Sequence, residues 1–171
     1  MSVGVKNQCQ TPLSPKIERL IQELLRKVPQ EHLAGLETIV LVDQVTHKRS
    51  RRQGVRGLYW PASQKRPATI ELAPSLIYHG MPKFLLHMPF FAKFALANIL
   101  YHEIGHHYHH RFAHGVTEEK SQSFADNYQH QMLKKAFFWW LLIVLPLWRV
   151  VRRFRGKRRQ LGKRGKSVRL A

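Results

Sequence analysis

One short run of residues, His102-Glu103-Ile104-Gly105-His106, has the residue types and the spacing of a hydrolytic metal site. On a helix, residues four apart lie about 40° apart around the axis and one turn apart along it, so both imidazoles can bind one metal ion. Glu103 would then lie beside a water molecule on that ion, where a carboxylate can take the proton and pass it to a leaving amine. The pattern predicts zinc-assisted hydrolysis of an amide, with His102 and His106 as ligands and Glu103 moving the proton.

The spacing of the motif leaves the third metal ligand open. A metzincin would have a histidine six residues after His106, and Phe112 stands there instead, so that class is excluded. The remaining candidates are polar side chains that follow the motif: His114, Glu118, Glu119, Gln122 and Asp126. The last four lie on one side of the helix predicted there, which favours a ligand from that helix.

Two helices are predicted to position these groups. The first begins at Pro89 and runs through the motif, because apolar residues recur on one face and neither Gly nor Pro interrupts before Gly105. A turn over Ala113–Val116 separates it from the second, which Thr117 caps and which runs from Glu118 at least to Leu133.

The part of the chain before Pro89 predicts one helix and a small sheet. Ser14-Pro15 is a helix start, apolar residues follow at helical spacing, and Pro29 ends the pattern. Three strands are predicted, at Leu36–Asp43, Val55–Trp60 and Ala68–Leu72. A basic loop over Thr46–Gly57 lies between the first two and overlaps the start of the second. The order of helix, three strands and two helices predicts a compact α+β domain.

Charge and cysteine content limit the classes of protein that the chain can belong to. The formal net charge is +19, and eleven of the 29 basic residues lie between Arg149 and Ala171, where there is no acid. This basic tail predicts a polyanionic partner, either anionic lipid or nucleic acid. The single cysteine, Cys9, excludes an intramolecular disulfide and a cysteine-rich zinc module. No secretory signal opens the chain, so a cytoplasmic location is expected.

An apolar run over Ala136–Trp148 precedes the basic tail. As a helix it would be about 20 Å long, which is shorter than the roughly 30 Å hydrocarbon core of a bilayer. Tryptophans near its ends and basic residues beyond them favour a shallow membrane association, with the tail on anionic head groups. A buried helix packed on the domain is the alternative for the run, and nucleic acid is the alternative partner for the tail.

Beyond the motif itself, the chain resembles the ImmA/IrrE-type metallopeptidases, minimal gluzincins in which HExxH is followed by a helix bearing Glu-x-x-Ala-Asp/Asn-x-Phe-Ala. The resemblance covers roughly Leu36 to Leu133. It implies a compact gluzincin-like domain that binds Zn²⁺ and cleaves peptide bonds of a protein substrate, with an edge strand over the metal cleft that holds an extended peptide. Together with the apolar run and the basic tail, these observations predict a division of the chain into a flexible lead (1–13), a metallopeptidase-like domain (14–133), an apolar, membrane-associated segment (134–151) and a basic disordered tail (152–171).

The helix after the motif fits the family's pattern in two registers. One places Ala125-Asp126 on the pattern and puts Gln122 where the family has its glutamate. The other puts Glu118 in the ligand position. Because glutamine offers only a neutral oxygen, we expect Glu118 to be the third ligand, followed by Glu119. The departure from the pattern also leaves two other hypotheses: a catalytically weak or inactive protein-binding module, and a nucleic-acid-binding protein that uses its tail.

Overall fold

The structure is a computed structural model that describes residues 3–10, 15–47, 54–64, 66–82, 85, 88–113 and 117–138. The chain forms two compact units, Met1–Ala136 and Phe137–Ala171. The fold and the site described below belong to the first unit. The basic tail and nearly all of the apolar run lie outside the described residues, as does His114. Among the described helices, none combines the length and the apolar character that crossing a membrane requires.

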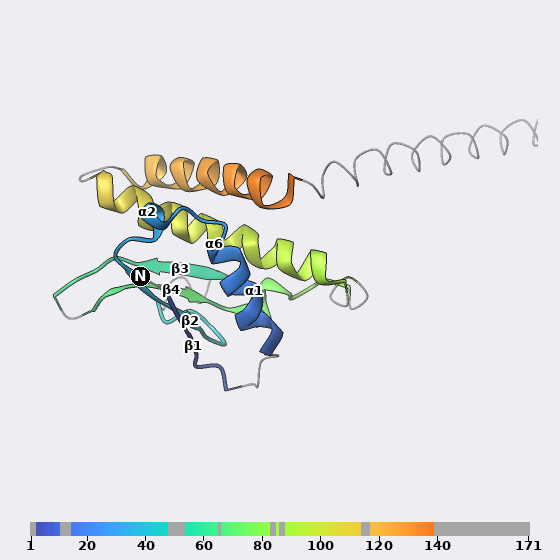
Figure 1. The fold of residues 1–171 in the computed structure, drawn as a ribbon. Helices are drawn as coiled ribbons and strands as arrows, with labels where there is room; N and C mark the ends of the chain where they lie inside the picture. The colour runs from blue at the N-terminus through green and yellow to red at the C-terminus, as the bar shows by residue number, and fades with distance from the viewer. Residues whose placement is uncertain are drawn as a thin grey trace, which may run out of the picture. The chain divides into compact units, whose positions relative to one another are not determined.

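A mixed sheet of four strands forms the base of the first unit (Figure 1). Its order is β1 (Gly4–Asn7), β2 (Leu36–Leu41), β4 (Ala68–Leu72) and β3 (Gly57–Trp60). β1 and β4 run parallel to β2, and β3 runs antiparallel to β4, which leaves β3 at one edge. The prediction of three strands was wrong, because β1 comes from the stretch that was expected to be a lead.

The two long helices begin where their sequences predict. α1 (Pro15–Leu25) starts at a proline, and its apolar spacing buries Ile21, Leu24 and Leu25. α6 (Pro89–Phe112) also starts at a proline and continues without a break through the HExxH motif. Residues 118–138 form the next described helix, which we call the 118–138 helix. Two single-turn helices, α2 (Gln30–Leu33) and α4 (Pro74–Ile77), lie in segments where the sequence predicted no element.

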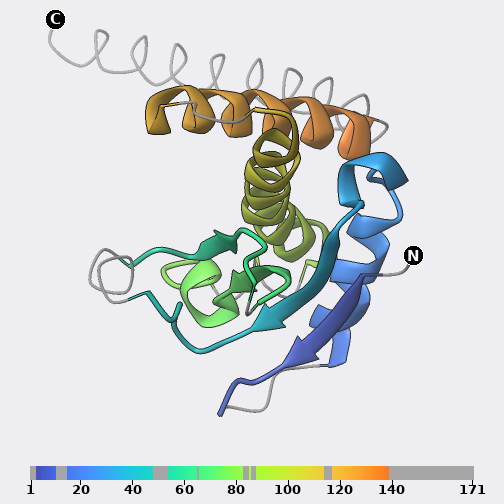
Figure 2. The same ribbon diagram turned by 90° about the vertical axis from the view of Figure 1, so that its left-hand side faces the viewer.

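Helices cover one face of the sheet. α6 packs on β3 and β4, while α1 packs on β1 and on α6. Figure 2 shows both helices on the same side of the sheet and the 118–138 helix crossing α6 on the side away from the strands. The motif-bearing helix is therefore enclosed between the sheet and a second helix.

Apolar side chains fill the space between the sheet and α6. Ile39 of β2 and Ile70 of β4 are fully buried, as are Leu96, Leu100 and Ile104 of α6. Burial of each such side chain stabilises the fold by roughly 1.5–3 kcal/mol. Ile104 belongs to the HExxH motif itself, so packing of its side chain fixes the rotation of α6 and turns the two motif histidines away from the core.

Candidate metal centre

The two histidines of the motif face one another on α6. Their Nε2 atoms are 3.1 Å apart, and both side chains are partly exposed. A tetrahedral zinc ion with Zn–N distances of about 2.0–2.1 Å would separate two imidazole nitrogens by about 3.3 Å. The spacing of His102 and His106 therefore suits two ligands of one ion, as the sequence predicted.

A carboxylate of the neighbouring helix fixes the tautomer of the first histidine. Oδ1 of Asp126 lies 3.1 Å from Nδ1 of His102. Since a carboxylate can only accept a hydrogen bond, Nδ1 of His102 carries the proton and Nε2 presents a lone pair. A carboxylate behind a histidine in this way orients metal-binding imidazoles in many zinc sites.

Two polar side chains of the same helix contact the second histidine. Oγ of Ser121 lies 3.1 Å from Nδ1 of His106, and Gln122 makes a side-chain hydrogen bond to the same imidazole. A hydroxyl can donate or accept, so two arrangements satisfy these distances. Either Nδ1–H donates to Ser121 and a cation lies between the two Nε2 atoms, or Nε2–H of His106 donates to Nε2 of His102.

Burial keeps the second histidine neutral. The pKa of His106 is lowered to about 4, mainly by burial and also by the nearby His102, while Gln122 and Asp126 act in the opposite direction. A neutral imidazole is the form that binds a metal ion, so at neutral pH no proton has to be removed from a charged ring first.

A close approach of two backbones brings these groups together. A Cβ atom on Gly105 would lie 2.8 Å from Cα of Ala125 and 3.2 Å from its carbonyl oxygen. Only glycine permits this contact between α6 and the 118–138 helix. Since Ser121 and Asp126 flank Ala125 on the same helix, the contact places them over the motif histidines.

Glu103 points toward the sheet edge and is almost fully buried. Its side chain lies against Gly57 of β3, where a Cβ would come within 3.0 Å of Cγ and Oε1 of the glutamate. The backbone N–H of Tyr59 donates to the Glu103 carboxyl and lowers its pKa, but burial dominates and raises the pKa to about 8.

The strand edge beside Glu103 is the outer edge of β3, with which no described strand pairs. The carbonyl of Arg56 accepts from Ala73 N–H, so residue 56 faces the β4 side. Because backbone groups alternate along a strand, Gly57 and Tyr59 face the opposite edge. The Tyr59 N–H that meets Glu103 is therefore part of the row that a further strand would use.

The next histidine of α6 has a structural role. His107 is 1% exposed, and its Nε2 lies 3.1 Å from the carbonyl of Ala34. A carbonyl only accepts, so Nε2 carries the proton and Nδ1 accepts from the Tyr59 hydroxyl at 3.3 Å. These two hydrogen bonds join α6 to the segment after α2 and to β3.

None of the described contacts joins Glu118 or Glu119 to the histidine pair, so the third ligand stays a prediction. Both glutamates are exposed, and so is Gln122, which with Ser121 lies beside His106. Within the described residues, no group of three or more His, Cys, Asp or Glu side chains is placed to hold a metal ion. The position of Gln122 beside His106 is compatible with both registers that the sequence allows.

Sequence reasoning missed the part that Ser121 plays and did not assign Asp126 to His102. The only available signal for Asp126 was its place after Ala125 in one of the two registers. No protein-family model, curated protein or solved structure matches the chain.

Proposed function

We propose that this protein is a zinc-dependent endopeptidase with a gluzincin-like domain. The observation that carries the proposal is the 3.1 Å separation of the His102 and His106 Nε2 atoms, on imidazoles whose Nδ1 atoms meet Asp126 and Ser121. Two lone pairs at this separation repel unless a proton or a cation lies between them. The Asp126 contact leaves the Nε2 lone pair of His102 facing His106, and the Ser121 hydroxyl permits either a proton or a cation between the two atoms; we propose the cation.

The two imidazole nitrogens are good zinc ligands, whereas the third group of the donor set is a weaker one. The third position goes to Gln122 rather than to Glu118, because Gln122 is the residue in contact with His106. Its amide oxygen is a neutral ligand, which binds zinc less strongly than a carboxylate does. Zinc held there would supply Lewis-acid activation of water and of the substrate carbonyl.

The chain's own residues would place the substrate and move the proton. An extended peptide can pair with the open edge of β3 through backbone hydrogen bonds, as peptides do on other exposed strands. Glu103 borders that edge, so its carboxylate lies near the peptide bond of a chain bound there. Since burial raises its pKa to about 8, Glu103 would have to be ionised first, which a cation bound beside it would favour; it would then take the proton of the attacking water and hand it to the leaving nitrogen.

Zinc content and peptide hydrolysis test the proposal directly. The purified full chain should bind about one zinc ion, measured by elemental analysis after dialysis, and His106→Ala should lose it. Glu103→Gln should keep the metal and lose hydrolysis of a denatured protein substrate. Zinc binding that survives His106→Ala, or hydrolysis at an unchanged rate in Glu103→Gln, would show that the assignment is wrong.

Gln122 favours a second candidate, a domain that binds a protein partner through the same strand edge with little or no catalysis. A weakened third ligand lowers both zinc affinity and activity without changing β3. In that case a bound peptide would protect β3 amides from hydrogen exchange while remaining uncleaved, and added zinc would not change the result.

The apolar run Ala136–Trp148 and the basic tail support a location at a membrane on the cytoplasmic side. Hydrophobic and electrostatic contacts together anchor a protein far better than either alone. The full chain should float with vesicles that contain phosphatidylserine. Duplex nucleic acid is the rival partner of the tail, and a steep fall of DNA binding with salt would favour it.

A further inference from the structure

A row of basic side chains follows the exposed face of α1. Lys16, Arg19, Arg26 and Lys27 are exposed and lie on one face by helical spacing, with Glu23 between them. Glu23 forms an ion pair with Lys93 of α6, and Lys93 holds its pKa below the usual range. Glu18 of the same helix is also exposed, but the basic side chains outnumber the acidic ones and Glu23 is paired, so the row presents a positive surface.

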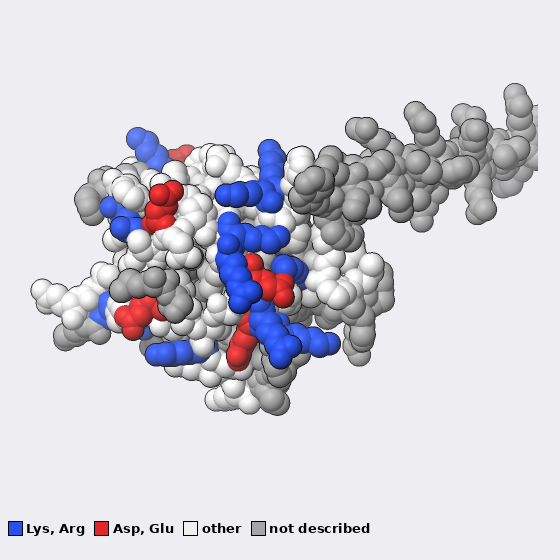
Figure 3. All heavy atoms as spheres, viewed as in Figure 1, with Lys and Arg blue, Asp and Glu red and all other residues white. Residues whose placement is uncertain are grey.

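The basic row continues to the point where the chain leaves the first unit. Nζ of Lys27 donates to the carbonyl of Ala136 over 2.7 Å, and Ala136 is the last residue of that unit. Lys134 and Lys135, both exposed, immediately precede it. Figure 3 shows the basic side chains gathered along this face. The apolar run therefore starts from the end of the positive surface.

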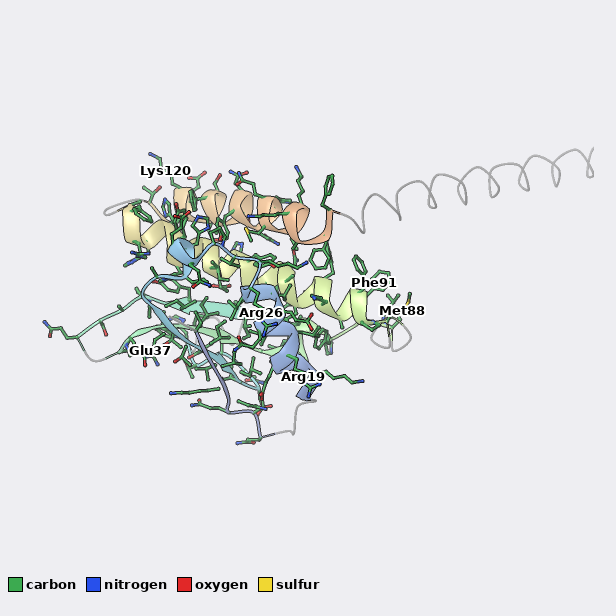
Figure 4. The ribbon with its side chains drawn as sticks, in the orientation of Figure 1. Arg19, Arg26, Glu37, Met88, Phe91 and Lys120 are labelled. Carbon is green, nitrogen blue, oxygen red and sulfur yellow. The ribbon has the colours of Figure 1, made fainter. Side chains whose placement is uncertain are left out.

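Apolar side chains are exposed at the beginning of α6, next to the same row. Met88 is 45% exposed, and Phe91 is half-buried. Lys93, which pairs with Glu23 of α1, lies within the same helical turns. Figure 4 shows Met88 and Phe91 at this end of α6, Arg19 and Arg26 on α1, and Lys120 at the far end of the molecule.

We propose that this face, formed by the exposed side of α1 and the first turn of α6, docks on an anionic lipid bilayer. The basic row would lie on the head groups while Met88 and Phe91 enter the interface between head groups and acyl chains. The inference extends the proposed membrane association from the end of the chain to its folded unit. It does not depend on zinc or on peptide hydrolysis.

Lipid explains the surface better than nucleic acid does. A phosphate backbone would use the basic row alone, whereas a bilayer also accepts exposed apolar side chains beside it.

Removal of charge from the row tests its electrostatic part. The full-length double variant Arg19→Gln/Arg26→Gln should bind phosphatidylcholine–phosphatidylserine vesicles about 10- to 30-fold more weakly, since each basic residue near such a surface contributes about fivefold. Arg66→Gln/Lys120→Gln removes the same charge elsewhere and should change vesicle binding little. Equal losses in both pairs would mean that only net charge matters and would overturn the proposal.

A fluorescent probe tests which face meets the bilayer. In a Cys9→Ser background, an environment-sensitive dye on Met88→Cys should shift to the blue when these vesicles are added, and a dye on Lys120→Cys should not. Flotation of the full chain without a shift at residue 88 would show attachment by the tail alone. Loss of duplex DNA binding in Arg19→Gln/Arg26→Gln, with vesicle binding unchanged, would assign the row to nucleic acid. Either result refutes the proposed surface.

Discussion

Oδ1 of Asp126 lies 3.1 Å from Nδ1 of His102, although the two residues belong to different helices. Through this contact, the 118–138 helix orients one histidine of the HExxH motif. The carboxylate would also partly neutralise the charge of a cation bound on the other side of the ring.

Loss of this carboxylate should weaken zinc binding. Asp126→Ala is expected to lower the zinc affinity about 10- to 100-fold, since His102 would lose the acceptor that keeps its proton on Nδ1. Competition with a fluorescent chelator measures the change. Asn127→Ala, at the exposed neighbouring position, serves as the matched control. If both variants bind zinc as the native chain does, Asp126 has no part in the site.

A charged side chain at residue 122 should strengthen the site. Gln122→Glu is expected to raise the zinc affinity on the order of tenfold or more, because a carboxylate oxygen replaces a neutral amide oxygen beside His106. Glu118→Ala should leave the affinity unchanged, since none of the described contacts joins Glu118 to the motif histidines. Isothermal titration distinguishes the two positions. A large loss in Glu118→Ala, with no gain in Gln122→Glu, would restore Glu118 as the third ligand.

Local patterns predicted the elements that carry a strong hydrophobic signal. The expected strand Ala68–Leu72 coincides with β4, and the helix expected from Pro89 is α6. β1 was missed because Gly4–Asn7 is mostly polar and exposed, so only its pairing with β2 makes it a strand. The single turns α2 and α4 are too short for helical periodicity to reveal.

The sequence likewise predicted one part of the candidate site and missed another. His102 and His106 are neighbours by helical spacing alone, so the sequence predicts the pair. The partners Ser121, Gln122 and Asp126 depend on how the next helix crosses α6, and that crossing is set by the contact of Gly105 with Ala125. A preference for charged ligands favours Glu118 as the third ligand, and that assignment stays a prediction, because none of the described contacts joins Glu118 to the histidines.

The contact between Gly105 and Ala125 leads to a prediction about stability. Gly105→Ala should destabilise the fold by about 1–3 kcal/mol, because the added Cβ would lie 2.8 Å from a backbone atom. Alanine is the better helix former by about 1 kcal/mol, so a loss can come only from this clash. Chemical denaturation followed by circular dichroism measures it. Gly4→Ala, whose Cβ would meet nothing closer than 3.6 Å, should be tolerated.

The last prediction concerns the strand that covers Glu103. A Cβ on Gly57 would lie 2.5 Å from Cγ2 of Ile99 and 3.0 Å from Glu103, so Gly57→Ala must push both side chains aside. We expect a loss of about 1–3 kcal/mol in the free energy of unfolding. Ile99→Ala removes the nearer atom, so the same substitution should cost less in that background, by about 0.5 kcal/mol or more in a double-mutant cycle.

The double-mutant cycle also distinguishes an effect of Gly57 on packing against α6 from an effect on peptide hydrolysis. In the double variant the remaining conflict is with Glu103, so zinc binding should stay near the native level while peptide hydrolysis stays low. Strictly additive losses of stability would mean that Gly57 does not press on Ile99. Full recovery of hydrolysis along with stability would show that the position of Glu103 against β3 does not govern the reaction.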